Sequence, residues 1–213
     1  ISFDLVLPSP GRFHGRLDLG LDDQLAIDNR WYLAVQVNPP VPVLICSDAP
    51  SGKAWTDDPA FFLRAALNAP GWISPRTVAR LSPADLKGEN VVYYPQTARL
   101  DISALDSFLK TGGRSAVLFT SLTSLEPVLE RLGLGTTAAV TTADEPATVD
   151  QTDAADPLLA ALGFKSSIYH QIAVSRYVKL APAPGAEALL VLSSGDPLLV
   201  KRRIGRSTVY AFT

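Results

Sequence analysis

The feature that most constrains the fold is an alternation of short apolar runs with helical segments between residues 41 and about 135. The run 41–46 is almost entirely apolar, as expected of a strand that is buried on both faces. Capping residues and apolar side chains at helical spacing mark the helical segments. In chain order we expect strands at 41–46, 77–81, 90–94 and 116–119, and helices at 57–69, 103–111 and 125–132. This alternation predicts an α/β domain with a mostly parallel sheet and helices on both faces.

The first 38 residues follow a different pattern. Apolar and polar side chains alternate at 12–19, and the run 31–37 is also typical of a strand. No helical segment separates these runs, so we expect a short antiparallel β segment. Consecutive prolines at 39–40 end it, because proline cannot continue a hydrogen-bonded ladder. We therefore divide the chain into a β segment at 1–38 and an α/β domain at 39–213.

The region from residue 136 onward mixes strands with one short helix. Residues 136–150 are rich in Thr, Ala and Val, and they fit either a strand pair or one extended excursion. A Pro near the start and a Gly at the end predict a helix at 156–163. The strands expected after it are 172–180, 188–192, 198–202 and 208–212. We expect these strands to form a meander that closes the sheet.

Composition excludes several classes of function. Hydrophobic residues make up 47% of the 213 residues and charged residues 19%, which suits a folded domain rather than a disordered chain. A net charge of −2 gives no electrostatic basis for binding nucleic acid. No run approaches the roughly 20 apolar residues that span a bilayer. We therefore expect no nucleic-acid partner and no direct membrane insertion by this segment.

One cysteine and two histidines leave little material for a metal site. Cys46 lies inside an apolar run, so we interpret it as a small buried residue rather than a nucleophile. His14 and His170 form no metal-binding spacing. The sequence therefore predicts neither a metal nor a cofactor.

Strand-like patterns reach both ends of the sequence. The chain begins at Ile1 with an alternating run, and its last strand-like run stops one residue before Thr213. Met is absent throughout. We therefore expect the chain to be a fragment of a larger protein.

A polar loop follows the first buried strand. Ser47, Asp48 and Lys53 stand where open α/β sheets bind ligands, at the carboxyl edge. Lys53 does not complete a phosphate-binding motif, because Ala54 stands where that motif has Ser or Thr. An ordinary connecting loop is the favoured interpretation, and a small ligand-binding crevice is the alternative.

Ser121 is the second candidate position. It lies in a run rich in Ser and Thr between the strand at 116–119 and the helix at 125–132. Short hydroxyl side chains commonly cap helices, and we favour that role. A nucleophilic Ser121 would need His170, the only histidine downstream, as its base.

Several motifs taken together resemble a known family. They are Asp22 and Asp28 with the residues up to 32, followed by 42–46, 61–67, 105–113 and 195–200. This set resembles the class I glutamine amidotransferase-like region of bacterial membrane proteins that carry a von Willebrand factor A domain, akin to the Bat (aerotolerance) family. The resemblance implies a flavodoxin-like sheet preceded by the end of a β-sandwich module. It also implies a membrane-anchored parent protein, with this domain facing the periplasm.

The catalytic residues of amidotransferases are missing from this sequence. In that family a cysteine flanked by glycines follows the strand that here runs from 116 to 119, but this chain has neither at 120–123. His170 is not followed by the acidic residue of an H-x-E motif. We therefore predict a non-enzymatic interaction or structural module that binds protein partners or neighbouring domains. The alternative is a divergent hydrolase, or a small-ligand sensor that uses the crevice near Asp48 or Ser121.

Overall fold

The computed structural model divides the chain into two compact units, Ile1–Val41 and Pro42–Thr213, which are described separately below. The described residues are 6–7, 9–18, 20, 29–47, 58, 60–69, 72–94, 101–119, 126–153, 155–162 and 170–213.

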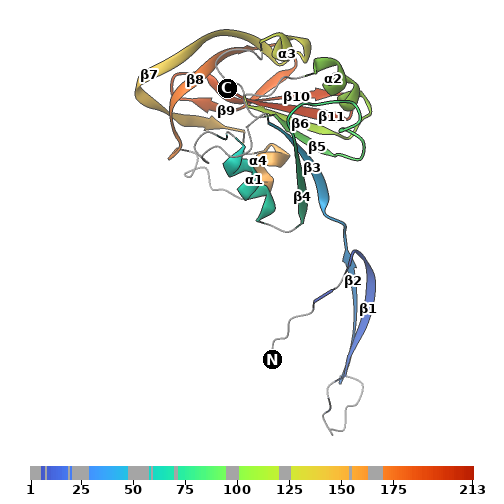
Figure 1. Cartoon of the computed structure of the whole chain (residues 1–213). Helices are drawn as coiled ribbons and strands as arrows, with labels where there is room; N and C mark the ends of the chain where they lie inside the picture. The colour runs from blue at the N-terminus through green and yellow to red at the C-terminus, as the bar shows by residue number, and fades with distance from the viewer. Residues whose placement is uncertain are drawn as a thin grey trace. The chain divides into compact units, whose positions relative to one another are not determined.

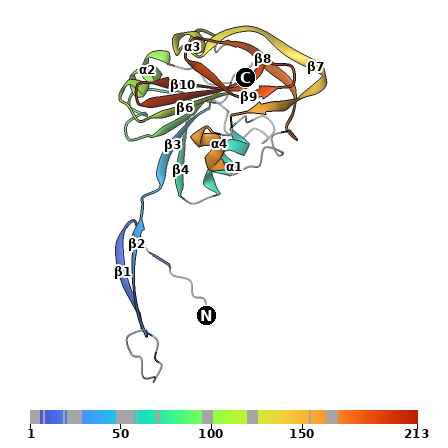
Figure 2. The same cartoon turned by 180° about the vertical axis from the view of Figure 1, so that it is seen from behind.

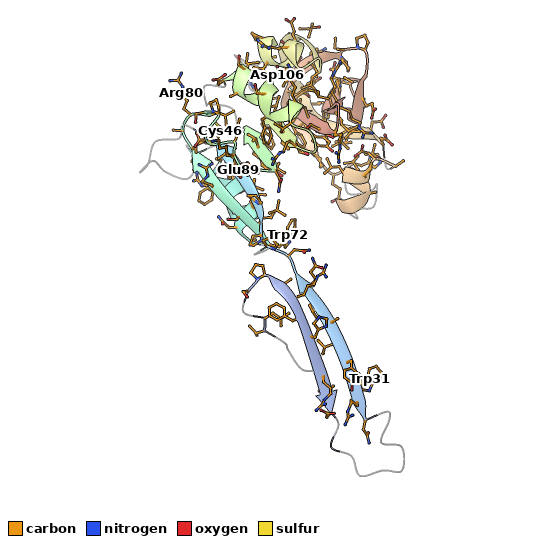
Figure 3. The ribbon with its side chains drawn as sticks, turned by 90° about the vertical axis from the view of Figure 1, so that its right-hand side faces the viewer. Trp31, Cys46, Trp72, Arg80, Glu89 and Asp106 are labelled. Atoms are coloured by element: carbon orange, nitrogen blue, oxygen red, sulfur yellow. The ribbon has the colours of Figure 1, made fainter. Side chains whose placement is uncertain are left out.

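The first unit contains a β-hairpin. Strands β1 (Gly11–Asp18) and β2 (Arg30–Val37) pair antiparallel, which confirms the pairing predicted for this segment. Apolar side chains gather on one face because the strand period is two, so that Phe13 lies opposite Val35. Trp31 on β2 is 65% exposed (Figure 3). A β-sandwich to which this hairpin belongs remains a prediction.

The second unit is built on one sheet of nine strands in the order β4-β3-β5-β6-β11-β10-β9-β7-β8 (Figures 1 and 2). Its helices are short, and none in the described part of the chain is long and apolar enough to cross a membrane. The strands are β3 (Val41–Cys46), β4 (Ile73–Val78), β5 (Val91–Tyr94), β6 (Ser115–Phe119), β7 (Gly135–Thr152), β8 (Ala173–Pro182), β9 (Ala186–Leu192), β10 (Pro197–Ile204) and β11 (Ser207–Phe212). The helices are α1 (Phe61–Asn68), α2 (Ile102–Lys110), α3 (Glu126–Arg131) and α4 (Pro157–Leu162).

The sheet is mixed, so the prediction of a mostly parallel, flavodoxin-like sheet is wrong. Strands β3, β5, β6 and β11 pair parallel to one another. Four other pairs are antiparallel, namely β11–β10, β10–β9, β9–β7 and β7–β8. The expected meander forms from β9 to β11, but β7 inserts between β9 and β8. Short turns join β9 to β10 and β10 to β11, and such turns permit only antiparallel neighbours.

Residues 136–150 belong to one long strand. The strand β7 has 18 residues, and its ladder with β8 is interrupted between Thr142 and Ala147. Of the two interpretations left open by the sequence, the extended strand is therefore correct. The strand expected at 77–81 instead lies at Ile73–Val78 as β4.

Helices α2 and α3 cover one face of the parallel strands. Leu105 and Leu109 of α2 and Leu129 of α3 are completely buried. They pack in one cluster with the side chains that the central strands direct to this face, namely Val92, Ala116, Leu118, Val200, Val209 and Ala211. Asp101 starts α2 by accepting a hydrogen bond from the Ala104 N–H at 3.0 Å, so of the two capping positions that the sequence allows, Asp101 and Ser103, it is the first that caps the helix.

In the described part of the chain, the opposite face of the same strands is only partly covered, so the prediction of helices on both faces is wrong in this respect. Along β6 the side chains alternate between buried Ala116 and Leu118 and half-buried Val117 and Phe119. Among the described residues, the six-residue helix α4 packs on this face over the antiparallel strands. Helix α1 packs against β4, near one edge of the sheet. The helical segments were predicted close to their observed positions. The sequence did not indicate how little of this face the described helices cover.

A close approach of two backbones fixes the start of β7. Gly135 has φ +151°, and a Cβ atom there would lie 2.2 Å from the Ala181 carbonyl oxygen on β8. We expect Gly135→Ala to lower the free energy of unfolding by about 3 kcal/mol or more, because a rigid backbone atom blocks the methyl group. Urea denaturation of the purified chain measures this loss.

The matched control is Gly205→Ala. Gly205 also has a positive φ, +60°, but no atom lies within 4 Å of the added methyl group. It should cost only the roughly 1–2 kcal/mol of the left-handed conformation. Equal losses in the two variants would show that the backbone contact at Gly135 is unimportant.

Candidate functional site

Ser47 is buried at the carboxyl end of β3. It is 4% exposed, and its backbone N–H donates to the Val78 carbonyl oxygen at 2.9 Å. Its Oγ has no hydrogen-bond partner among the described residues. A buried hydroxyl without a partner costs about 1–3 kcal/mol, so this oxygen is available to a ligand. Of the four candidate binding residues, Ser47 is the one whose surroundings are described.

The other three candidates, Asp48, Lys53 and Ser121, lie outside the described residues. The crevice expected around Ser47 and Asp48 therefore remains a prediction. Cys46, next to Ser47, is completely buried in the core, which confirms its interpretation as a small buried residue (Figure 3).

His170 is held by a backbone carbonyl group. Its Nδ1 lies 2.6 Å from the carbonyl oxygen of Val149 on β7. Because a carbonyl oxygen only accepts, Nδ1 carries the proton and Nε2 is the acceptor in the neutral ring. The second histidine, His14, belongs to β1 in the first unit. A base at His170 Nε2 still requires Ser121, which is not described, so the hydrolase hypothesis stays a prediction.

A cavity of about 460 Å³ lies on the partly covered face of the sheet. Five strands and α4 contribute to its walls, and the volume falls within the roughly 300–1,000 Å³ of small-molecule pockets. None of the described residues that line it carries a charge. The lining residues are Val91, Tyr93, Ser115, Val117, Phe119, Leu158, Leu159, Ile172, Leu190, Leu199, Tyr210 and Phe212.

Three aromatic rings in this lining stack across neighbouring parallel strands. Tyr93 of β5 and Phe119 of β6 have ring centroids 6.5 Å apart and planes inclined by 21°. The rings of Phe119 and of Phe212 on β11 are stacked and nearly parallel, with centroids 5.2 Å apart and planes inclined by 4°. All three rings come from the partly covered face, and they form an aromatic wall that no helix among the described residues seals.

A buried charge cluster lies beside Tyr210, which lines the cavity. Lys201 Nζ is 2.6 Å from Asp156 Oδ2 and 2.7 Å from Glu187 Oε2. Asp156 also starts α4, because its Oδ1 accepts the Leu158 N–H at 2.8 Å. The side chains of Asp156 and Lys201 are 2% and 13% exposed. The cluster therefore fixes α4 over the sheet, and its charges are already paired.

The charges of this cluster are stabilised by their partners. Burial opposes the ionisation of Asp156, but the hydrogen bonds from Lys201 and from the Leu158 N–H hold the pKa of its carboxyl below the usual value. The hydrogen bonds to Asp156 and then to Glu187 raise the pKa of Lys201. Burial, followed by the charge of Asp156, raises the pKa of Tyr210. Burial also raises the pKa of Tyr93, so both phenols are neutral near pH 7.

The described part of the site can bind but contains no assembled catalytic group. No cluster of three or more metal-ligating side chains occurs among the described residues. Sequence analysis missed both the cavity and the Lys201 cluster, since their members are far apart in the chain. One signal was available at the carboxyl edge where a ligand was expected: Phe119 and Phe212 end their strand runs, and Tyr93 is the next-to-last residue of its run.

No protein-family model and no curated protein sequence matches the chain. Solved structures do resemble it. A ThuA-like protein from Bacteroides uniformis has a TM-score of 0.59 at 14% identity, over 84% of this chain and 84% of that one. A cytoplasmic protein from Salmonella typhimurium has a TM-score of 0.57 at 12% identity, over 94% of this chain and 83% of that one. An exo-β-1,4-mannosidase from an Opitutaceae bacterium has 0.52 at 15% identity, over 82% of this chain but 31% of that one.

At these identities the similarity concerns the fold alone. ThuA-like proteins have a glutamine amidotransferase-like fold, which agrees with the fold part of the resemblance seen in the sequence. The second unit therefore has a fold similar to that of ThuA-like proteins, with a large antiparallel extension of its sheet.

The Asp156–Lys201 pair should make stability depend on pH. Asp156→Asn should lower the free energy of unfolding by about 3 kcal/mol near pH 7, because it leaves the Lys201 ammonium buried without its closest partner. In the parent chain, the contribution of Asp156 is present above the pKa of the unfolded carboxyl, 3.8, and disappears as the pH falls through the lower folded value. The contribution of Lys201 is complete below the unfolded pKa of 10.5 and disappears as the pH rises through its raised folded value.

Urea denaturation across this pH range tests both limbs. The matched control is Asp106→Asn, which removes the exposed ion pair with Lys110 on α2. That change should cost less than about 0.5 kcal/mol. A loss at Asp156 no larger than the loss at Asp106 would contradict the structural role of the buried pair.

Proposed function

We propose that this chain is a non-catalytic binding module of a larger protein, and that its binding surface is the partly covered face of the central sheet. The observation that carries the proposal is the cavity bounded by the Tyr93, Phe119 and Phe212 rings and by α4. Burying apolar surface stabilises a fold, so side chains such as Val117 and Phe119 are left half-covered at a cost of stability. A surface of this kind commonly marks an interaction site.

The comparisons support the modular part of this proposal. The matched region makes up 31% of the mannosidase chain, so a fold of this kind can occur as one part of a longer protein. Folds of this kind host many unrelated activities, so fold alone does not identify function. Protein partners or neighbouring domains are therefore proposed from the surface and not from the neighbours' names.

Two other functions remain as alternatives. The buried Ser47 Oγ without a described partner favours a small-ligand sensor at the carboxyl edge, with Asp48 and Lys53 nearby in sequence. The tautomer of His170 that its bond to Val149 requires leaves Nε2 as an acceptor, as a hydrolase using Ser121 would need. Each alternative depends on residues outside the described part of the chain.

The cellular setting belongs to the proposal as well. A membrane-anchored bacterial parent with a von Willebrand factor A domain rests on the sequence motifs alone. Fractionation of cells that express the full-length parent tests it, because an anchored parent is recovered with the membranes and released by detergent.

The absence of catalysis is tested with a fluorophosphonate probe, which labels activated serines. We expect no labelling of the purified chain, because a serine without a positioned base is a weak nucleophile. Ser121→Ala is the control. Labelling that disappears in this variant would identify Ser121 as an activated nucleophile and replace the binding module with a hydrolase.

Binding at the sheet face is tested with Nile red, a neutral dye that fluoresces in apolar surroundings. We expect saturable binding that Val117→Trp lowers at least about tenfold, because the larger side chain fills the cavity between Tyr93 and Tyr210. Val140→Trp is the matched control, since Val140 is 39% exposed on β7 and does not line the cavity. No saturable binding, or equal binding by both variants, would contradict the proposed surface.

A further inference from the structure

The walls of the cavity restrict the shape of what it can hold. One wall is the stack of Tyr93, Phe119 and Phe212, whose neighbouring planes are inclined by 21° and 4°. Leu158 and Leu159 of α4 also line the cavity. Aromatic rings interact favourably with other rings in offset-stacked or edge-on arrangements, by about 0.5–1.5 kcal/mol beyond the area that they bury. The wall therefore favours a ring over a saturated group of the same size.

The electrostatics of the cavity restrict the charge of its occupant. The described lining includes no charged side chain. In the charge cluster beside Tyr210, the Lys201 ammonium is paired with Asp156 at 2.6 Å and with Glu187 at 2.7 Å. An ion placed in the cavity would lose its hydration without gaining a counter-charge from the described lining, which is unfavourable. The occupant is therefore neutral.

Two hydroxyl groups give the cavity its polar character. Tyr93 and Tyr210 flank Val117 in the register of the parallel strands. Neither phenol has a hydrogen-bond partner among the described residues. A hydroxyl in an apolar pocket usually finds such a partner. Each can donate to an oxygen atom of an occupant, and each can accept from its hydroxyl group.

We propose that the cavity binds a neutral, planar aromatic molecule that carries a hydroxyl or carbonyl oxygen. The ring lies along the wall formed by Tyr93, Phe119 and Phe212, and the oxygen exchanges a hydrogen bond with Tyr93 or Tyr210. This assignment rests on the proposed function, since it concerns the same sheet face, and it commits the cavity itself to a small molecule rather than to a protein partner.

The test compares four probes by calorimetric titration of the chain of residues 1–213. They are 2-naphthol, its saturated analogue decahydro-2-naphthol, naphthalene without the hydroxyl group, and the anion 2-naphthoate. We expect 2-naphthol to bind roughly three- to tenfold more tightly than decahydro-2-naphthol, which loses the ring contacts. It should also bind more tightly than naphthalene, which lacks the hydroxyl group, and than 2-naphthoate, which is negatively charged.

Each outcome affects a different statement. Equal affinity for 2-naphthol and decahydro-2-naphthol would overturn the statement that the ligand is aromatic. Tighter binding of 2-naphthoate than of 2-naphthol would overturn the statement that the ligand is neutral. Naphthalene binding as tightly as 2-naphthol would overturn the oxygen contact. In all three cases Nile red binding that Val117→Trp removes would leave the proposed binding surface standing. Failure of Nile red together with all four probes would remove that surface itself.

Two variants locate the ring contact. Phe119→Leu keeps much of the apolar volume but removes the middle ring, so the preference for 2-naphthol over decahydro-2-naphthol should fall to roughly onefold to twofold. Phe61→Leu on α1 is the matched control, because Phe61 does not line the cavity, and it should keep the full preference. An unchanged preference in Phe119→Leu would overturn the assignment.

A measurement on the unmodified chain covers the case in which a variant does not fold. The measurement is the NMR chemical shift of methyl groups. The side chains of Val117 and Leu158 line the cavity, whereas those of Leu105 and Leu129 lie in the core on the opposite face. Saturating 2-naphthol should shift the first pair and leave the second pair unchanged. Shifts confined to Leu105 and Leu129, or no shifts, would contradict binding at this cavity.

Discussion

The pairing of β11 with β6 holds the two halves of the sheet together. On one side of this junction the strands are parallel, and on the other they are antiparallel. Ser207, at the start of β11, is completely buried. Its Oγ donates to the Leu109 carbonyl oxygen at 2.6 Å and accepts from the Arg114 N–H at 3.1 Å, which ties β11 to the end of α2 and the start of β6. Without this junction the aromatic wall would lose Phe212, and α4 would lose the sheet beneath it.

Much of the local structure could be predicted because its causes are local. Asp101 caps α2, and the Pro at 157 starts α4, as their sequence positions indicated. The architecture could not be predicted in the same way. A mixed sheet arises from which strands become neighbours, and no local pattern in the 18 residues of β7 specifies its place between β9 and β8. The alternation of helices and strands fits both a covered and a partly covered sheet, so only the packing distinguishes them.

Of the binding residues predicted from the sequence, Ser47 is the one that lies among the described residues, and it does not line the cavity. Ser47 was found because it follows a buried strand, and the carboxyl ends of parallel strands are where such folds bind ligands. The cavity combines side chains from five strands and α4, which are brought together by the β11–β6 junction. No spacing rule connects Tyr93 with Tyr210 along the chain. The same applies to the Asp156–Lys201 pair, whose members are 45 residues apart.

The position of β11 between β6 and β10 has a consequence for synthesis on the ribosome. The Arg114–Ser207 hydrogen bond at the junction joins residues that are 93 positions apart. At the usual pace of translation, this delay corresponds to roughly 5–20 s during which β6 has emerged without its second neighbour. An unpaired strand edge is a template for aggregation. The yield of folded chain in the cell is therefore governed by how well the nascent β6 edge is shielded, as well as by the stability of the finished fold.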